Sequence, residues 1–558
     1  MKMRKMFAVA LSTVFLGSAG ALAGCGKNPG VVNDDKTLNV AMYKGGYGSG
    51  WIMEIEEAFE KLYETEGYKI NILEPRTNLE GRTALSEMRL TMDTGVDLYL
   101  TTSSVTVGDV LDEEYGVCVE NMDELYNSKP INFDGTEGEM TLQQLYNESE
   151  SWKITDDAGS HWSYSYVGSV RGIVCNTKIL SQYGITQLPR TTDELFEAYD
   201  AIYYGANGKG GTSSTGIYPT TWGGDNAFAY SLNSLYTNMA QIMGVDAYDE
   251  FFKMDYILEN EETLKNGYTM YANEDFKEVL EVFIQQYDTA YSTLGSTTQK
   301  HDVAHGKLVM GNAAFMTDGE FFFNEVRVNF SNKLNDIAFI NIPVISYLGE
   351  KLKLDGTGSD AEKCDEILRY MIDQVDAGKS VAEIKAATEA EFTITLTDDQ
   401  VEKVQEARTI GYGGSVANGC YITKGTPKKH IAELFLRMMA SEDAATVYTK
   451  YGMLNSYSPA VESGYQYEFS KGAVRIINSC KYFASATLYP GSLRARTNMF
   501  VLPPYNAGIP KTIAEEIGVV SNPSERDYAK LALETYNNIT TATQKNWANY
   551  MSKAGYRI

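Results

Sequence analysis

The sequence predicts an α/β protein built from two large lobes. At 558 residues the chain is longer than one hydrophobic core normally supports. Between residues 37 and 102, strand-like apolar segments alternate with amphipathic segments in the order strand, helix, strand, helix, strand. This order favours right-handed β-α-β units and a parallel sheet. Because ligands of such sheets collect at the carboxyl ends of the strands, we expect a binding site at that edge.

A glycine-rich loop joins the first predicted strand to the first predicted helix. The strand is TLNVAM (37–42), and the loop YKGGYGSGW (43–51) follows it. From residue 52 onward, apolar side chains recur at helical spacing, which predicts one buried helix face. Two further apolar segments, YKINIL (68–73) and VDLYLTT (96–102), complete the first predicted sheet.

The rest of the chain continues this alternation, with one interruption. Residues 346–414 hold two acidic helical patterns and differ in character from the segments around them. The other segments with clear signals are a strand at 162–176, a helix at 188–202, a mostly helical region at 226–295, a strand-turn-helix unit at 306–326, strands at 335–345 and 415–425, and helices at 427–452 and 525–551.

The charge balance excludes two classes of partner. The chain has 48 Lys and Arg against 74 Asp and Glu, which gives a net charge of −26. Nucleic acids and anionic membranes are bound by clustered positive charge, so we expect neither as a ligand. Aromatic residues make up 12% of the chain, which leaves tyrosines for a surface cleft.

Residues 1–24 predict a signal peptide. Three basic residues within the first five precede an apolar stretch that ends in Leu-Ala-Gly before Cys25. This ending resembles the lipobox of bacterial lipoproteins, in which the cysteine receives a diacylglycerol and becomes the first mature residue. We therefore expect lipidation at Cys25, a flexible tether at 25–36, and a protein held at the extracellular face of the cytoplasmic membrane. The alternative is a plain secretory peptide with an incidental cysteine.

The five later cysteines predict buried free thiols. No two of them form a CxxC metal or redox motif, and most lie in apolar contexts, although one disulfide stays open as an alternative. No segment after residue 25 is apolar for long enough to predict a membrane-spanning helix.

The glycine-rich loop favours a ligand with flat faces over a phosphate. It lacks the Lys-Ser/Thr ending of a P-loop and the GxGxxG pattern. It carries Tyr43, Tyr47 and Trp51 instead. Sugars present C–H faces that stack on aromatic rings, and hydroxyls that need charged or amide partners. We predict these three residues as ligand contacts, with a buried position on the helix face as the alternative for Trp51.

Two loops that follow other predicted elements supply further candidate contacts. Ser103 and Ser104 follow the third strand, at the same predicted edge as the glycine-rich loop. Trp222 and Asp225 lie in the glycine turn TTWGGDN, where the alternative is a solvent loop anchored by a buried tryptophan.

The segment MTDGEFFF supplies Asp318, Glu320 and Phe321 at the beginning of a predicted helix. Asp318 is predicted either to contact ligand or to cap that helix. Arg171 is predicted to face the cleft or to pair with an acidic side chain. Asn455 follows YGML near the expected hinge and is a further candidate contact.

Histidine spacing raises one metal hypothesis. His301 and His305 in HDVAH are four residues apart and could share a helix face toward a metal ion. The HExxH pattern is absent and no third ligand is near in the sequence, so a solvated helix face is expected. We therefore predict no metal, no cofactor and no catalytic residue.

The order of these motifs resembles the extracellular solute-binding proteins of ABC importers, in the sugar-binding group that includes maltose-binding protein. From residue 45 to residue 444 the shared order is GGYGSGW with EIEEAFEK, VDLYLTT, GSVRGIVCNTKIL, LPRTTDELFEAYDAI, GKLVMGNAAFMTDGEFFFNEV and GCYITKGTPKKHIAELFLRMMASEDA. Phe321 stands where tryptophan is common in the family, and residues 346–414 exceed the usual length.

The resemblance implies a type II periplasmic-binding-protein-like fold, with a ligand cleft between two α/β lobes and a hinge of crossover strands. It also implies a monomer that captures a carbohydrate, expected to be an oligosaccharide, and delivers it to the importer's membrane subunits. The implied divisions are the first lobe at 37–167, the second at 168–340, a return to the first lobe at 341–455 with a helical insertion at 346–414, and the hinge with second-lobe helices at 456–558.

Other functions stay open on the sequence alone. The same fold could hold a peptide or another small polar solute. An acidic chain has many carboxylate pairs, so a surface glycoside hydrolase is an alternative, although no motif selects a pair. A lipid-anchored adhesin is disfavoured because the chain has no repeats and only 13 prolines.

Overall fold

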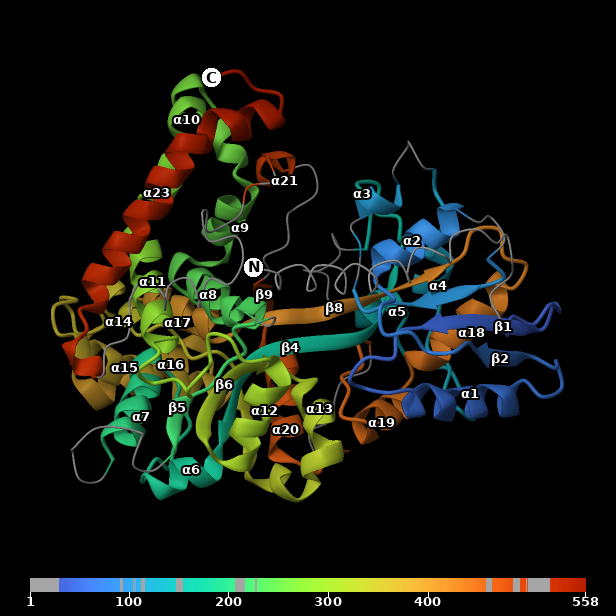
Figure 1. The fold of residues 1–558 in the computed structure, drawn as a ribbon, viewed down its shortest axis with the longest axis horizontal. Helices are drawn as coiled ribbons and strands as arrows, with labels where there is room; N and C mark the ends of the chain where they lie inside the picture. The colour runs from blue at the N-terminus through green and yellow to red at the C-terminus, as the bar shows by residue number, and fades with distance from the viewer. Residues whose placement is uncertain are drawn as a thin grey trace, which may run out of the picture.

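Two long antiparallel strands connect two lobes in the computed structural model (Figure 1). The model describes residues 30–90, 94–103, 105, 107–111, 116–146, 154–205, 216–225, 228–457, 464–484, 492–497, 499 and 522–558. The connecting strands are β4 (Tyr164–Asn176) and β8 (Ile410–Ile422), which pair along much of their length. The predicted α/β fold of two lobes with crossover strands is confirmed.

The first lobe is built on a parallel sheet. Strand β1 (Thr37–Met42) is buried along its whole length and lies between β2 (Lys69–Ile72) and β3 (Leu98–Leu100), both parallel to it. The carboxyl end of β8 pairs antiparallel with β3. The helices of this lobe are α1 (Gly50–Leu62), α2 (Gly81–Leu90), α3 (Val107–Val110), α4 (Asp123–Tyr126), α5 (Leu142–Leu145), α18 (Lys429–Met439) and α19 (Glu442–Lys450).

The second lobe uses the other ends of the crossover strands. The second half of β4 pairs with β6 (Ala313–Gly319) and β7 (Ile337–Ile340), β6 pairs with β5 (Tyr218–Thr220), and β8 begins beside β9 (Tyr482–Ala484). The main helices around this sheet are α6 (Thr177–Gln182), α7 (Thr192–Tyr204), α8 (Phe228–Met243), α9 (Val245–Lys253), α10 (Glu261–Asn266), α11 (Glu274–Gln286), α12 (His301–Met310), α13 (Phe322–Phe330), α20 (Glu468–Ser479), α21 (Leu493–Thr497) and α23 (Tyr528–Lys553).

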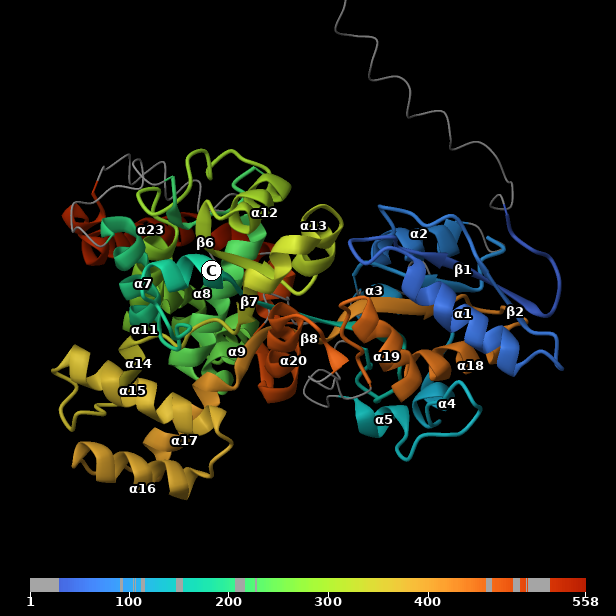
Figure 2. The same cartoon turned by 90° about the horizontal axis from the view of Figure 1, so that it is seen from below.

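The acidic segment 346–414 packs on the second lobe and not on the first. Its helices are α14 (Tyr347–Lys351), α15 (Ala361–Asp376), α16 (Val381–Phe392) and α17 (Asp398–Arg408), and Figure 2 shows α15, α16 and α17 on the side of α8, far from α18. Leu368 and Val404 share one hydrophobic core with Met239 of α8.

This placement corrects the expected return to the first lobe at residue 341. The chain crosses back only within β8, because the apolar faces of α15 and α17 are buried against helices of the second lobe. The two helical patterns were recognisable in the sequence, but the surface that buries them was not.

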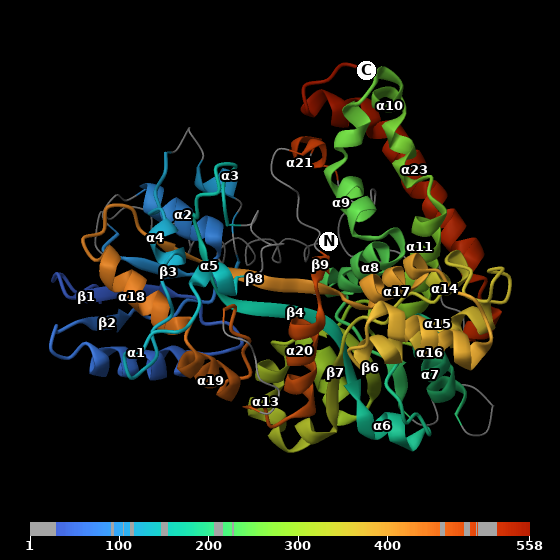
Figure 3. The same cartoon turned by 180° about the vertical axis from the view of Figure 1, so that it is seen from behind.

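Helix α23 forms a long outer edge of the second lobe, where it lies against α11 (Figure 3). In the described part of the chain, no helix is both long and apolar enough to cross a membrane. The five described cysteines are unpaired; Cys118 is half-buried and the others are buried. Cys25 and the whole of 1–29 lie outside the described residues.

The crossover strands are irregular where they pass between the lobes. The pairing of β4 with β8 shifts register twice between Ser165 and Ser169. Opposite this stretch, Gly413 and Gly414 have φ angles of 113° and 130°. Such φ angles favour glycine, so the backbone leaves regular strand geometry at the connection between the lobes.

Candidate ligand-binding site

Loops from the two lobes meet beside the crossover strands. The loop after β1 reaches the turn between β6 and α13, where the Tyr47 hydroxyl donates a hydrogen bond to the Glu320 carboxylate. In the same loop, a Cβ atom built on Gly46 would lie 3.1 Å from Cγ of Glu325 in α13. Two segments 273 residues apart, each predicted to contribute to the site, therefore come together.

Glu320 connects the lobes, and both of its carboxylate oxygens already accept hydrogen bonds from the protein. Its side chain is 1% exposed and accepts hydrogen bonds from Ser169 Oγ at 2.9 Å and the Val170 N–H at 2.8 Å. Arg171 Nη1 lies 3.3 Å from the same carboxylate. Burial, together with the nearby negative charge of Glu320, raises the pKa of Tyr47 well above its usual value. The Tyr47–Glu320 contact therefore holds a neutral tyrosine against a carboxylate.

A half-buried aromatic surface lies next to this contact. The Arg171 guanidinium lies 4.7 Å from the ring centre of Phe321 and 5.8 Å from that of Tyr230. The Tyr230 and Phe321 rings are 5.4 Å apart, and the Tyr230 ring is 4.7 Å from the imidazole of His301. Burial, with a further contribution from Asp318, raises the pKa of Tyr230 to about 12. Of the two alternatives for Arg171, the structure shows the pairing with an acidic side chain, Glu320, and Arg171 also lies over the two aromatic rings.

Sequence reasoning missed Tyr230, which contributes to this surface from the first turns of α8. It sits within a long run of helical pattern, and nothing local distinguishes it from a core tyrosine. Only the packing of α8 against β6 brings it to Phe321.

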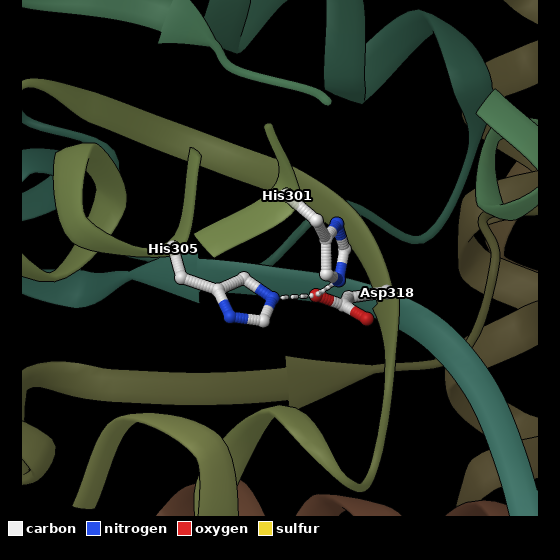
Figure 4. A group of neighbouring side chains, drawn as sticks. All are labelled: His301, His305 and Asp318. Carbon is white, nitrogen blue, oxygen red and sulfur yellow. Dashed lines mark hydrogen bonds and ion pairs between the residues drawn. The ribbon is translucent and has the colours of Figure 1, made fainter. Parts of the chain in front are cut away.

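Asp318 lies at the centre of a histidine cluster (Figure 4). It is fully buried on β6, with its Oδ2 2.6 Å from His305 Nε2 and 3.3 Å from His301 Nε2. Burial alone would raise the pKa of Asp318, but the two imidazoles hold it below its usual range. Helix α13 begins after Phe321, so Asp318 does not cap it.

The expected solvated face for His301 and His305 is wrong, as is the expectation that no third ligand lies near. His305 is 3% exposed, because α12 packs on β6 and α13. The spacing of four residues was the correct signal, but the strand that brings Asp318 between the histidines begins eight residues later.

The two predicted contacts on the loop after β5, Trp222 and Asp225, have different environments in the structure: Trp222 is buried and Asp225 is exposed. Trp222 is 5% exposed, and its Nε1 donates to Ser292 Oγ at 2.8 Å. It borders a cavity of about 10 Å³, about the room for one water, together with Tyr230 and His301. Asp225 is exposed, and its backbone N–H bonds to the Gln299 carbonyl at 3.2 Å.

In the first lobe the glycine-rich loop supports an aromatic ring. Gly45 has a φ angle of 48°, which favours glycine, and a Cβ there would lie 2.5 Å from the Tyr43 ring, so any side chain at this position would displace that ring. Tyr43 itself is half-buried, and its backbone N–H bonds to the Leu100 carbonyl at 2.8 Å. Ser103 is half-buried and its Oγ lies 3.4 Å from the Gly81 N–H, while Ser104 lies outside the described residues.

Two predicted contacts belong to the core of the first lobe instead. Trp51 is 2% exposed and stacks on Tyr166, with ring centres 5.8 Å apart, because it falls on the buried face of α1. Asn455 is buried; its amide donates to the Met439 carbonyl at 2.9 Å and its Oδ1 accepts from the Tyr457 N–H at 2.9 Å. Its polar atoms therefore stabilise a turn.

Comparison with solved structures identifies the class of fold. No protein-family model matches the sequence, and no curated protein sequence matches it significantly. A chitin oligosaccharide binding protein aligns over 91% of this chain and 99% of its own, with a TM-score of 0.53 and 12% identity. The bacterial solute receptor AcbH, described as having an exclusive preference for β-D-galactopyranose, covers 92% and 100%, with a TM-score of 0.53 and 10% identity.

A third similar structure is a probable secreted solute-binding lipoprotein from Streptomyces coelicolor, with coverage of 91% and 100%, a TM-score of 0.51 and 15% identity. The chain therefore has the two-lobed fold of the solute-binding proteins, as the sequence resemblance implied. The names of these three structural neighbours describe binding proteins or a solute receptor.

Proposed function

We propose that this protein is an extracellular binding protein that captures a carbohydrate between its lobes and delivers it to an ABC importer. The observation that carries the proposal is the surface of Arg171, Tyr230 and Phe321 beside the connection between the lobes. Half-buried rings offer faces on which sugar C–H groups stack, and a guanidinium offers several fixed donors to hydroxyls. An oligosaccharide is the proposed ligand, because Tyr47 of the first lobe and Tyr230 and Phe321 of the second lobe lie around one contact between the lobes and could together face more than one sugar ring.

The proposed contacts combine predicted residues with residues that the packing brings to the cleft. Tyr230 joins the predicted set and Arg171 is kept as a contact, whereas Trp51, Trp222, Asn455 and the buried carboxylates of Asp318 and Glu320 are left out. The retained predicted contacts are Tyr43, Tyr47, Ser103, Asp225 and Phe321.

The proposed mechanism is a change in population and not catalysis. The lobes move about β4 and β8, and a ligand that contacts both lobes stabilises the closed arrangement. The Tyr47–Glu320 hydrogen bond is a contact between the lobes that such a movement makes or breaks. Membrane subunits of the importer would recognise the closed form, and the protein would act as a monomer without a cofactor.

A thermal-shift screen tests the ligand class. The purified protein is mixed with mono- and oligosaccharides, with peptides, amino acids and polyamines as controls. A ligand of the folded state raises the melting temperature by mass action, and we expect a glycan to do so without being cleaved. A shift with peptides alone would overturn the carbohydrate assignment, and a cleaved glycan would favour a glycoside hydrolase.

The glycan that shifts the melting temperature is then titrated into Phe321→Ala. We expect affinity to fall about five- to tenfold, since one aromatic contact contributes about 1 kcal/mol. Phe392→Ala is the matched control, because Phe392 also has a cation, Lys363, 4.4 Å from its ring centre but lies on α16. Equal affinity in both variants would show that the glycan binds at another surface.

We also propose that Cys25 carries the lipid that holds the protein at the outer face of the membrane. Its support is the sequence Leu-Ala-Gly-Cys after an apolar stretch. Cys25→Ala is expected to move the protein from the membrane fraction to the medium, measured by immunoblotting of both fractions. Cys118→Ala is the control, and continued membrane binding of Cys25→Ala would disprove the lipid anchor.

A further inference from the structure

The histidine cluster of the second lobe has the chemistry of a metal site. His301 Nε2, His305 Nε2 and Asp318 Oδ2 come from α12 and β6 and point toward one another (Figure 4). Their ligand atoms all lie within 4.8 Å of one another. Imidazole nitrogen and carboxylate oxygen are ligands that Zn²⁺ binds in proteins.

The two distances to Asp318 suit a small divalent ion after a slight adjustment. Tetrahedral Zn²⁺ with bonds of about 2.0–2.1 Å places its ligand atoms about 3.3–3.4 Å apart. The His301–Asp318 distance is already 3.3 Å. The His305–Asp318 distance is 2.6 Å, which is a hydrogen bond. A metal would replace the proton of this bond and increase the distance between the two atoms by somewhat under 1 Å.

A neighbouring carboxylate lies beside His305, as carboxylates do beside histidines in known metal centres. His305 Nδ1 lies 3.4 Å from Glu325 Oε2, so a carboxylate faces the ring nitrogen that would not bind the metal. Such carboxylate–histidine pairs select the tautomer and increase the basicity of the ligating nitrogen.

His301 supplies an independent indication. Both its ring nitrogens are shielded from solvent, and neither has a hydrogen-bond partner of good geometry. Its Nε2 has only the ion-pair contact with Asp318. Buried polar atoms nearly always have a hydrogen-bond partner. The Nε2 of His301 has none and faces a buried carboxylate, so its position suits a bond to a further atom.

We propose that His301, His305 and Asp318 bind one divalent transition-metal ion of the Zn²⁺ type. The three protein ligands leave a fourth position for water or another donor. The ion would join α12 to β6 directly beneath the ligand-binding surface, because His301 contacts Tyr230 and Asp318 lies three residues before Phe321. This inference does not depend on the identity of the transported solute.

Metal binding is measured directly on the purified protein. After treatment with a chelator, the protein is dialysed against ZnCl₂ and the bound metal is quantified by mass spectrometry. We expect about one equivalent per chain, and with Co²⁺ the visible absorption of a tetrahedral nitrogen and oxygen site. Less than about a tenth of an equivalent, or no cobalt absorption, would overturn the proposal.

Variants show whether the bound ion uses these residues. His301→Phe keeps a ring against Tyr230 but removes both nitrogens, and we expect at least tenfold weaker binding. Glu325→Gln should weaken binding by about tenfold through His305. The Glu325 side chain is 38% exposed, so we expect the variant to fold as wild type does. His430→Phe, an exposed histidine of the first lobe, is the control. Binding equal to wild type in His301→Phe and Glu325→Gln would overturn the site.

Discussion

Replacing Arg526 with methionine is expected to lower the free energy of unfolding by about 3–5 kcal/mol. Arg526 Nε lies 2.7 Å from Asp288 Oδ2, and the two side chains are 3% and 0% exposed. Without the guanidinium, a buried carboxylate keeps only neutral partners, among them the Tyr528 hydroxyl at 3.0 Å. Removing one member of a buried ion pair is strongly destabilising, because the remaining charge has lost both water and its counterion.

The effect should extend beyond the ion pair. Arg526 lies just before α23, and the Asp288 carbonyl accepts a hydrogen bond from Ser292 Oγ at 2.9 Å. Ser292 in turn accepts from Trp222, so the pair anchors both the long C-terminal helix and the loop after β5.

Urea unfolding followed by circular dichroism measures this loss. The control is Arg475→Met, which removes an exposed ion pair with Glu468 at 3.0 Å. Exposed pairs contribute about 1 kcal/mol or less, so the control should remain near wild type. A loss in Arg526→Met no larger than in the control would show that Asp288 is stabilised by other means.

Gly413→Ala is expected to destabilise the protein by about 2 kcal/mol or more and to disturb the connection between the lobes. Gly413 has a φ angle of 113°, where a side chain is strained. A Cβ atom there would also lie 2.1 Å from the Ser169 carbonyl oxygen, so β8 must move away from β4. Ser169 donates to Glu320, and the movement therefore reaches the Tyr47 contact between the lobes.

A second glycine separates backbone strain from the steric effect. Gly378, after α15, has a φ angle of 73°, and a Cβ there would meet nothing within 4 Å. Gly378→Ala should lose only about 1–2 kcal/mol, the strain of the left-handed backbone. Unfolding by urea and glycan affinity are measured for both variants. Equal losses of stability, with unchanged glycan affinity in Gly413→Ala, would contradict the proposed role of the strand pairing.

Local patterns were enough to predict several elements of the fold. The apolar run before the glycine-rich loop became β1, and the spacing after residue 51 became α1 with Ile52, Ile55 and Phe59 buried. The segment that holds Asp318 and Phe321 became β6 followed by α13. These predictions succeed because the periodicity of burial along a strand or a helix depends only on the few residues that form it.

The candidate site was predicted less completely than the fold. Tyr47 and Glu320 were both predicted, but as ligand contacts, and the structure joins them to each other. Trp51 was equally compatible with the cleft and the core, since a residue at the beginning of a helix can face either one. The packing of the Trp51 ring against Tyr166 and Tyr448 places it in the core.

By itself, the sequence determined the α/β class, the order of the elements and the resemblance to two-lobed solute-binding proteins, because these depend on local periodicity and on motif order. Only the tertiary structure decided that α15 and α17 belong to the second lobe, that Tyr230 lies beside Phe321, and that Asp318 lies between His301 and His305. Each of these depends on which surfaces bury one another across long stretches of chain, and the periodicity of one segment carries no information about its partner.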